Sequence, residues 1–293
     1  MCMLETFFFI IGLNSTLYLF FSALNIVKSI LSSNNLSAYG KGSWALITGC
    51  TDGIGEGFTE TLAKQGFNII QVSRNPEKLK NQAQDLKAKY GIKVKSICKD
   101  FSQCSKDPVT FFNDIFFQTK DLDVSLLINN IGATSNTIKK SFAEVGIDNL
   151  TNLITLNLFP IVFLTRIYLP EMNKRTHKSG IINLSSVLAD LRLKFNIPYG
   201  ASKNFDKYFT ISIQAENDRK SKVDILCLQP GYVDTVAVRK YKPTILVINR
   251  FECAESAMKC LGNVQVTNGH PKHLLMSIIG KIASLGINYL RKN

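Results

Sequence analysis

Short apolar runs alternate with longer amphipathic stretches from Trp44 onward. Apolar runs of about four to eight residues between turn residues are typical of buried strands, and stretches such as 76–90 and 148–174 are long enough for helices. This alternation predicts an α/β fold: a doubly wound parallel sheet with helices on both faces. The predicted strands are Trp44–Thr48, Phe67–Ser73, Val94–Cys98, Ser125–Asn129, Gly180–Leu184 and Asp224–Gln229.

Residues 7–27 form an uncharged and mostly apolar stretch near the N-terminus. A helix of about 20 apolar residues crosses the ~30 Å hydrocarbon core of a bilayer. A cleaved signal peptide has a basic start and a shorter apolar core, and a surface helix of a soluble domain has a polar face. Here the polar residues 14–16 are consecutive and form no such face. We therefore predict a membrane anchor, one transmembrane helix, over 1–31 and a Ser- and Asn-rich linker over 32–43.

The residues that flank this segment indicate its orientation. Glu5 precedes it, whereas Lys28 and Lys41 follow it. Because cytoplasmic flanks are enriched in Lys and Arg, we expect the rest of the chain in the cytoplasm. The seven cysteines are scattered without a C-x-x-C pair, which indicates a reducing compartment rather than a disulfide framework.

The C-terminal stretch 271–293 is predicted to be a separate hydrophobic tail. Its residues 274–290 are apolar apart from Lys281 and a few Ser, Gly and Asn residues. This stretch is short for a membrane span, so we favour a helix that lies on or dips into the bilayer over a core helix.

Composition and charge exclude several classes of protein. An apolar share of 45% excludes a disordered chain, and three His without a C-x-x-C pair indicate no metal site. The chain has 35 Lys and Arg against 22 Asp and Glu, a net charge of +13. These basic residues are spread out, without an arginine-rich run, which argues against nucleic acid as a partner. Diffuse positive charge suits a membrane surface or an anionic substrate.

A glycine-rich turn follows the first predicted strand and leads into a helical pattern. Ligands of such sheets bind beyond the carboxyl ends of the strands. Glycines at this place let the backbone approach a pyrophosphate, which rests on the helix N-terminus, although a tight turn that binds nothing is the alternative. The candidate dinucleotide-binding residues of the turn are Thr48, Gly49, Thr51, Asp52, Gly53, Ile54 and Gly55.

The end of the second strand indicates which dinucleotide is bound. NAD sites place an acid about 20 residues after the glycines, where it holds the ribose 2′-hydroxyl. This chain has Ser73 and Arg74 there. An arginine fits a 2′-phosphate, so we predict NADPH/NADP+; an exposed arginine at the start of a helix is the alternative.

Tyr199 and Lys203 are spaced i and i+4, so on a helix their side chains share one face. A phenol is a poor proton donor and base at neutral pH, and a nearby ammonium moves its pKa toward the working range. Ser186 follows the predicted strand Gly180–Leu184 and can donate a hydrogen bond to a carbonyl oxygen. These residues predict reduction of a ketone by hydride transfer.

With these motifs, residues 44–269 resemble the short-chain dehydrogenase/reductase family. The resemblance implies a single Rossmann-type domain, assigned to 44–270. The implied catalytic residues are Asn157, Ser186, Tyr199 and Lys203, where Asn157 supports the lysine through water and Ser186 also binds substrate. The implied cofactor residues beyond the turn, Ser73 and Arg74 are Asp100, Asn129, Asn130, Gly132, Tyr199, Lys203, Pro230, Gly231, Val233 and Thr235.

Finer features are similar to a membrane-bound branch of this family, which contains 17-beta-hydroxysteroid dehydrogenases and very-long-chain 3-oxoacyl-CoA reductases. They are Thr-Asp-Gly-Ile-Gly in the turn, Ser-Arg after the second strand and Asn-Asn-Ile-Gly after the fourth. The resemblance implies an enzyme of the endoplasmic reticulum membrane with a cytosolic catalytic domain, as a homodimer. The branch's dilysine-type retrieval signal is not clearly matched by Leu290–Asn293.

The predicted function is NADPH-dependent reduction of a ketone on a lipid, with Tyr199 as proton donor. The substrate is a 3-oxoacyl-CoA of fatty acid elongation or a 17-ketosteroid, with an apolar pocket expected over Tyr232–Phe251. Oxidation of retinol or another lipid alcohol is an alternative. The alternative from another class is a non-catalytic membrane scaffold that senses a nucleotide.

Overall fold

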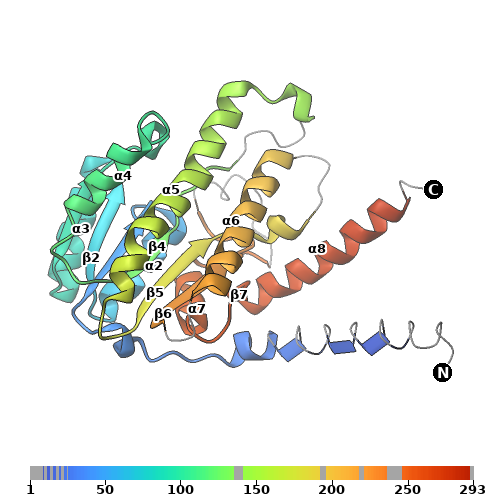
Figure 1. Ribbon diagram of the computed structural model, residues 1–293, viewed down its shortest axis with the longest axis horizontal. Coiled ribbons are helices and arrows are strands. Elements are labelled where there is room, and N and C mark those ends of the chain that lie inside the picture. The colour runs from blue at the N-terminus through green and yellow to red at the C-terminus, as the bar shows by residue number, and fades with distance from the viewer. Residues whose placement is uncertain are drawn as a thin grey trace.

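The computed structural model in Figure 1 shows a layered domain from which two helical segments project. The side chains of residues 282 and 285–290 are outside its description. The residues it describes are 9, 12–13, 16–17, 20, 23–24, 26–134, 141–191, 196–217, 221–235 and 246–290.

Within the described residues, seven parallel strands form one sheet in the order β3-β2-β1-β4-β5-β6-β7. The six predicted strands are confirmed to within one residue at each end, and the short β7 is an addition. The strands are β1 (Trp44–Thr48), β2 (Asn68–Ser73), β3 (Val94–Cys98), β4 (Val124–Asn129), β5 (Ser179–Leu184), β6 (Val223–Leu228) and β7 (Val266–Thr267).

Helices cover both faces of the sheet, as predicted for a doubly wound fold. Each strand contributes side chains to two hydrophobic cores, one on each face of the sheet, because successive side chains point to opposite faces. Thus Ala45 and Ile47 of β1 pack with α2 (Gly53–Lys64), α3 (Pro76–Tyr90) and α7 (Arg250–Cys260). Leu46 packs on the other face, which is covered by α4 (Pro108–Phe117), α5 (Ile147–Asn173) and α6 (Ile197–Glu216). Short 3-10 helices are η1 (Leu36–Tyr39), η2 (Phe101–Gln103), η3 (Phe142–Glu144) and η4 (Val187–Asp190).

Among the described residues, α5 is the one helix long and apolar enough to cross a membrane. Its Leu164, Tyr168 and Met172 are nevertheless buried in the core against the sheet. An apolar helix of this kind is expected where one face packs on strands and another on neighbouring helices, here α4 and α6. We therefore interpret α5 as a core helix.

The predicted linker 32–43 contributes to the core of the domain. Tyr39 of η1 is 1% exposed, and its hydroxyl donates to Oδ2 of Asp224 at 2.8 Å. Burial and the neighbouring Asp224 raise the pKa of Tyr39 well above its usual range. Asn34 donates to the carbonyl oxygen of Leu261 at 2.7 Å. These contacts attach this part of the chain to the amino end of β6 and to the end of α7.

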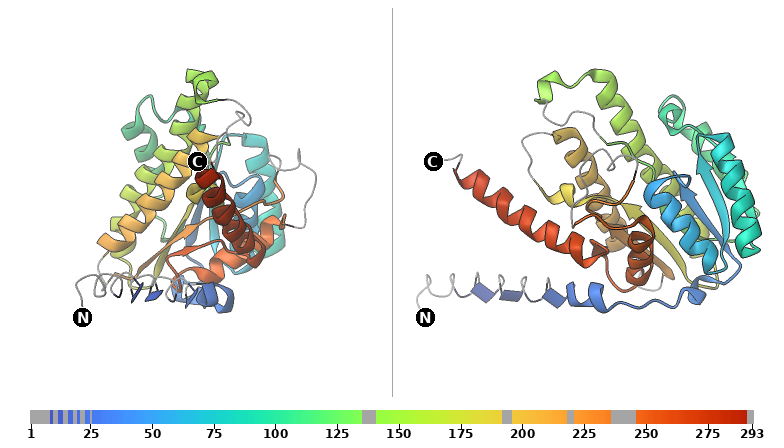
Figure 2. Two further views of the ribbon diagram at one scale, coloured as in Figure 1. Left: turned by 90° about the vertical axis from the view of Figure 1, so that its right-hand side faces the viewer. Right: turned by 180° about the vertical axis from the view of Figure 1, so that it is seen from behind.

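Most of the predicted transmembrane stretch 7–27 lies outside the described residues. The positions described within it include exposed apolar side chains such as Leu13 and Val27. The predicted tail forms a helix, α8 (Pro271–Leu290), which exposes Leu275, Ile278 and Ile279. The described residues 26–31 of the N-terminal segment and α8 leave the domain from the same side (Figures 1 and 2).

Candidate active site

The predicted glycine turn lies where the strand order reverses, between β1 and β4. Thr48, the last residue of β1, accepts hydrogen bonds at its hydroxyl from the N–H groups of Asn130 and Ile131, both at 3.0 Å. The amide of Asn130 donates back to the carbonyl oxygens of Thr48 and Gly49, at 2.8 and 3.2 Å. The two loops are therefore fastened together, and Asn130 supports the shape of the turn.

The turn forms a cradle that side chains would fill. A Cβ added to Gly55 would lie 2.2 Å from the carbonyl oxygen of Gly49, and Gly53 has a positive φ of 56°. Helix α2 begins at Gly53, and its N-cap residue Asp52 makes no side-chain capping bond. Free N–H groups at a helix N-terminus favour an anion. The turn thus fits the pyrophosphate of a dinucleotide.

The end of β2 lies beside this turn, as predicted. Ser73 Oγ is 2.9 Å from Thr51 Oγ1, which joins β2 to the turn. Arg74 is exposed, and the described residues give its guanidinium no ion pair. This placement leaves a positive charge at the position predicted for the 2′-phosphate.

Two predicted cofactor residues make contacts within the protein. Asp100 is exposed and caps η2, with Oδ1 accepting from the N–H of Ser102 at 3.0 Å. Asn129 is buried and donates to Thr165 at 3.1 Å and to Asn183 at 2.8 Å. Its side chain therefore contacts α5 and β5, not the glycine turn, whereas Asn130 contacts the turn.

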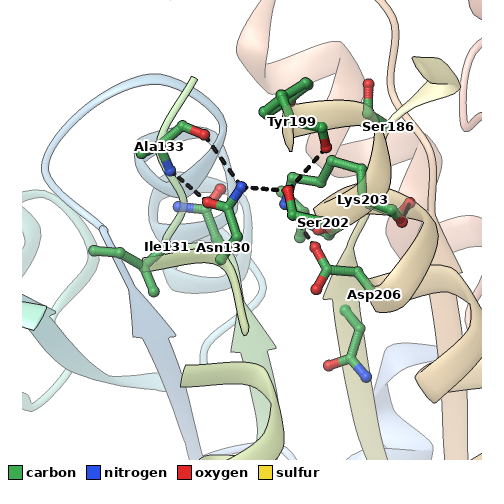
Figure 3. A network of polar contacts seen from close by, with 12 residues as sticks. Asn130, Ile131, Ala133, Ser186, Tyr199, Ser202, Lys203 and Asp206 are labelled. Carbon is green, nitrogen blue, oxygen red and sulfur yellow. Dashed lines mark hydrogen bonds and ion pairs between the residues drawn. The ribbon is translucent and has the colours of Figure 1, made fainter. Parts of the chain in front are cut away.

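Tyr199 and Lys203 both lie on α6, as their spacing predicts (Figure 3). Nζ of Lys203 donates to the carbonyl oxygen of Leu184 at 2.9 Å and to Oδ2 of Asp206 at 2.8 Å. Burial opposes the charge on Lys203, but Asp206 and Tyr199 outweigh it and hold the pKa of this amine above its usual range. Gly132 lies against the amine, since an added Cβ there would be 3.5 Å from Nζ.

Asn157 on α5 connects the loop after β4 to α6. Its Oδ1 accepts from the N–H of Ala133 at 2.7 Å, and its Nδ2 donates to Ser202 Oγ at 2.8 Å. Ser202 in turn donates to the carbonyl oxygen of Tyr199 at 2.8 Å. Asn157 is thus two hydrogen bonds away from the backbone of the predicted proton donor.

Ser186 follows β5 and starts η4. Its Oγ accepts from the N–H of Leu188 at 3.2 Å, which leaves the hydroxyl proton available for a carbonyl oxygen. Ser186 is 7% exposed and lies on the same side of Lys203 as Tyr199 in Figure 3. Helix η4, which Ser186 caps, packs against α6, so the structure places the predicted hydrogen-bond donor and proton donor on neighbouring elements.

The loop after β6 completes the site. The carbonyl oxygen of Pro230 accepts from the N–H of Val187 at 3.1 Å, and Val233 pairs with Ile248 in an isolated bridge. Thr235 touches the glycine turn, because a Cβ on Gly53 would lie 2.9 Å from its Cγ2. Part of the expected substrate pocket over Tyr232–Phe251, residues 236–245, lies outside the described residues.

Three residues of the site were not predicted from the sequence: Ser202, Asp206 and His273. His273 of α8 is fully buried behind Gly231, and its Nε2 lies 2.9 Å from the carbonyl oxygen of Tyr232. Burial lowers the pKa of His273. Burial also raises the pKa of Asp206 to about 6, although the Lys203 ammonium opposes this. A polar position at i+3 from Lys203 is a signal that could have identified Asp206.

Comparisons with known proteins agree with this arrangement. Residues 43–245 match the short chain dehydrogenase family. The very-long-chain 3-oxoacyl-CoA reductase of Rattus norvegicus is 32% identical, over 82% of this chain and 75% of its own length. The 17-beta-hydroxysteroid dehydrogenase type 3 of Danio rerio is 33% identical, over 81% and 76%.

Solved structures show the same fold at lower sequence identity. A 7beta-hydroxysteroid dehydrogenase is 22% identical with a TM-score of 0.74, covering 88% of this chain and 99% of its own. A short-chain dehydrogenase from Sphingobium yanoikuyae in complex with NADPH is 21% identical with a TM-score of 0.68, covering 83% and 94%.

Proposed function

The chain belongs to the short-chain dehydrogenase family, and from that premise we propose that it reduces a ketone on a lipid substrate with NADPH. Family membership confirms the predicted resemblance and the oxidoreductase class. The use of a nicotinamide dinucleotide is supported by the structural neighbour in complex with NADPH. The observation that carries the proposal is the placement of Tyr199 and Lys203 on α6, next to η4 with Ser186 and to Gly132 of the loop that is joined to the glycine turn. When bound, the cofactor supplies the hydride.

The residues of this chain then have separate tasks. Ser186 donates a hydrogen bond to the carbonyl oxygen, where negative charge develops as the hydride arrives. Tyr199 gives the proton to that oxygen, and the Lys203 ammonium stabilises the phenolate that remains. Asn157 holds the loop after β4 and, through Ser202, the first turn of α6 in place.

The proton donor is tested by replacing Tyr199 with Phe in the full-length protein. General acid–base groups contribute roughly 10²–10⁴ to the rate, so we expect at least a hundredfold loss of kcat with unchanged NADPH affinity. Tyr208→Phe is the matched control, because Tyr208 lies on the same helix and is 74% exposed. Near-normal turnover by Tyr199→Phe contradicts the mechanism.

We propose NADPH rather than NADH because Arg74 is exposed at the end of β2 beside Ser73, and no acid occupies either position. A guanidinium pairs well with a 2′-phosphate. Replacing Arg74 with Asp is expected to weaken binding of NADPH by tenfold or more and binding of NADH by less. Equal weakening of both contradicts the assignment. Fluorescence titration of each dinucleotide measures the difference.

For the substrate we propose a 3-oxoacyl-CoA, and a 17-ketosteroid is the second candidate. Relatives with both names match most of this chain. The net charge of +13 favours the phosphate-bearing acyl-CoA. Detergent-solubilised protein is given NADPH with a long-chain 3-oxoacyl-CoA or with a 17-ketosteroid, and loss of NADPH absorbance is followed. Turnover of the steroid alone refutes the first choice.

We propose that the protein is anchored in the endoplasmic reticulum membrane with its catalytic domain in the cytosol. The uncharged stretch 7–27 in the sequence and the exposed apolar side chains of α8 support this. Removing residues 1–27 tests the anchor while keeping Asn34 and Tyr39, which pack into the domain. We expect weaker retention in carbonate-washed membranes; unchanged retention assigns anchoring to α8. The proposed homodimer is tested by light scattering.

A further inference from the structure

Asp206 is a buried carboxylate in contact with Lys203, and the tasks assigned above do not use it. Its side chain is 1% exposed, and Oδ1 has no hydrogen-bond partner among the described residues. Aspartate is almost never buried this fully unless it is paired. A buried ion pair is often no more stabilising than apolar side chains of the same volume. The position of Asp206 therefore calls for a reason other than stability.

The contacts of Lys203 provide that reason. An ammonium has three N–H donors, and two of them are directed to the carbonyl oxygen of Leu184 and to Asp206. One donor remains for the reaction site. In Figure 3 Tyr199 lies above Lys203 and Asp206 lies below it. Asp206 thus takes one donor of the ammonium in an ion pair within α6, three residues along the helix.

The other titratable groups around this pair do not replace Asp206. Asp190 of η4 is 2.5 Å from Lys207 and is paired with it. Cys227 of β6 is buried, and burial raises the pKa of its thiol to about 12, so the thiol carries no charge at neutral pH. Among the described residues, Asp206 is the carboxylate paired with Lys203.

We propose that Asp206 is a positioning residue that keeps Lys203 in place and charged at the end of β5. This inference rests on the proposed function, because Lys203 acts there on Tyr199. Without the carboxylate, burial alone acts on the amine and favours its neutral form. The site then loses its positive charge at a lower pH than in the wild type.

Asp206→Asn tests the pairing with little change of shape. NADPH affinity is measured by fluorescence from pH 6 to pH 10 in the full-length protein. We expect the alkaline loss of affinity to move down by at least about one pH unit, since a desolvated amine holds its proton less tightly. Asp224→Asn is the matched control: Asp224 is paired with Lys178 at the amino end of β6, away from the carboxyl ends of the strands. An Asp206→Asn profile identical to the wild-type profile overturns the proposal.

A double-mutant cycle with Lys203→Met separates positioning from a general structural effect. If Asp206 acts through Lys203, Asp206→Asn has no further effect on NADPH affinity in the Lys203→Met background. An equal effect in both backgrounds overturns the proposal. If Asp206→Asn alone does not fold, restored folding of the double variant supports the pairing, and failure of the double variant to fold refutes it.

The same measurements distinguish this inference from the proposed function. If the wild type binds NADPH but reduces no ketone, the proposed function fails. The double-mutant cycle, measured as NADPH affinity, still tests the proposed role of Asp206. If the wild type does not bind NADPH, the proposed function fails. The double-mutant cycle is then measured as melting temperatures. Effects of the two substitutions that do not add support the pairing of Asp206 with Lys203, and additive effects refute it.

Discussion

Gly55→Ala is expected to distort the glycine turn that would hold the cofactor, although it adds only one methyl group. The new Cβ would lie 2.2 Å from the carbonyl oxygen of Gly49 and 2.5 Å from Nδ2 of Asn130. Carbon and oxygen atoms normally approach to about 3.4 Å, so the backbone of Gly49 has to move by about 1 Å. Gly49 is tied to Asn130, which resists this movement.

The magnitude follows from two opposing effects. Alanine is favoured over glycine inside a helix by about 1 kcal/mol, whereas overpacking costs about 1–3 kcal/mol. The strain falls on the turn that would hold the pyrophosphate. Misplacement of a group that positions a ligand by about 1 Å can lower the reaction rate on the order of 10²-fold. We therefore expect the NADPH dissociation constant to rise at least tenfold, with a small loss of stability.

Fluorescence titration with NADPH is the assay, and Gly146→Ala is the control. Gly146 precedes α5 with a φ of −62°, and the nearest atom to an added Cβ is 3.7 Å away. Alanine therefore fits there without moving its neighbours. If Gly55→Ala binds NADPH as tightly as the control does, the cradle is not the pyrophosphate site.

Three further predictions concern stability. Tyr39→Phe removes the hydrogen bond to Asp224 and is expected to cost about 1–3 kcal/mol in urea unfolding, with unchanged NADPH affinity. Gly57→Ala would place a Cβ 2.3 Å from the carbonyl oxygen of Arg250, so we expect a loss of about 1–3 kcal/mol as α2 and α7 separate; no loss contradicts the tight packing. Burial lowers the pKa of His273, so the neutral imidazole stabilises the folded protein fully above about pH 6.5, and this stabilisation is lost as the pH falls. We expect the melting temperature of the wild type to decrease between pH 7 and pH 5, and His273→Gln to make that decrease smaller.

The sequence alone determined the strands, the two-sided cover of helices and the candidate catalytic residues. Buried parallel strands read as apolar runs whatever their neighbours are, so six strands were predicted to within a residue. The spacing of Tyr199 and Lys203 fixes their relative placement once they are on a helix. The Gly49–Gly55 turn was likewise recognisable, since its backbone requirements are local.

Tertiary structure alone decided which way ambiguous polar residues point and which short segments join the sheet. The two-residue β7 has no periodicity of its own and exists because β6 offers it an edge. Asn129 and Asn130 are adjacent and chemically identical, yet one faces α5 and the other the glycine turn, because Asn129 ends β4 inside the sheet and Asn130 begins the loop that packs on the turn. Asp206 is buried because the fold closes around it, and its partner Lys203 offsets the desolvation of its charge.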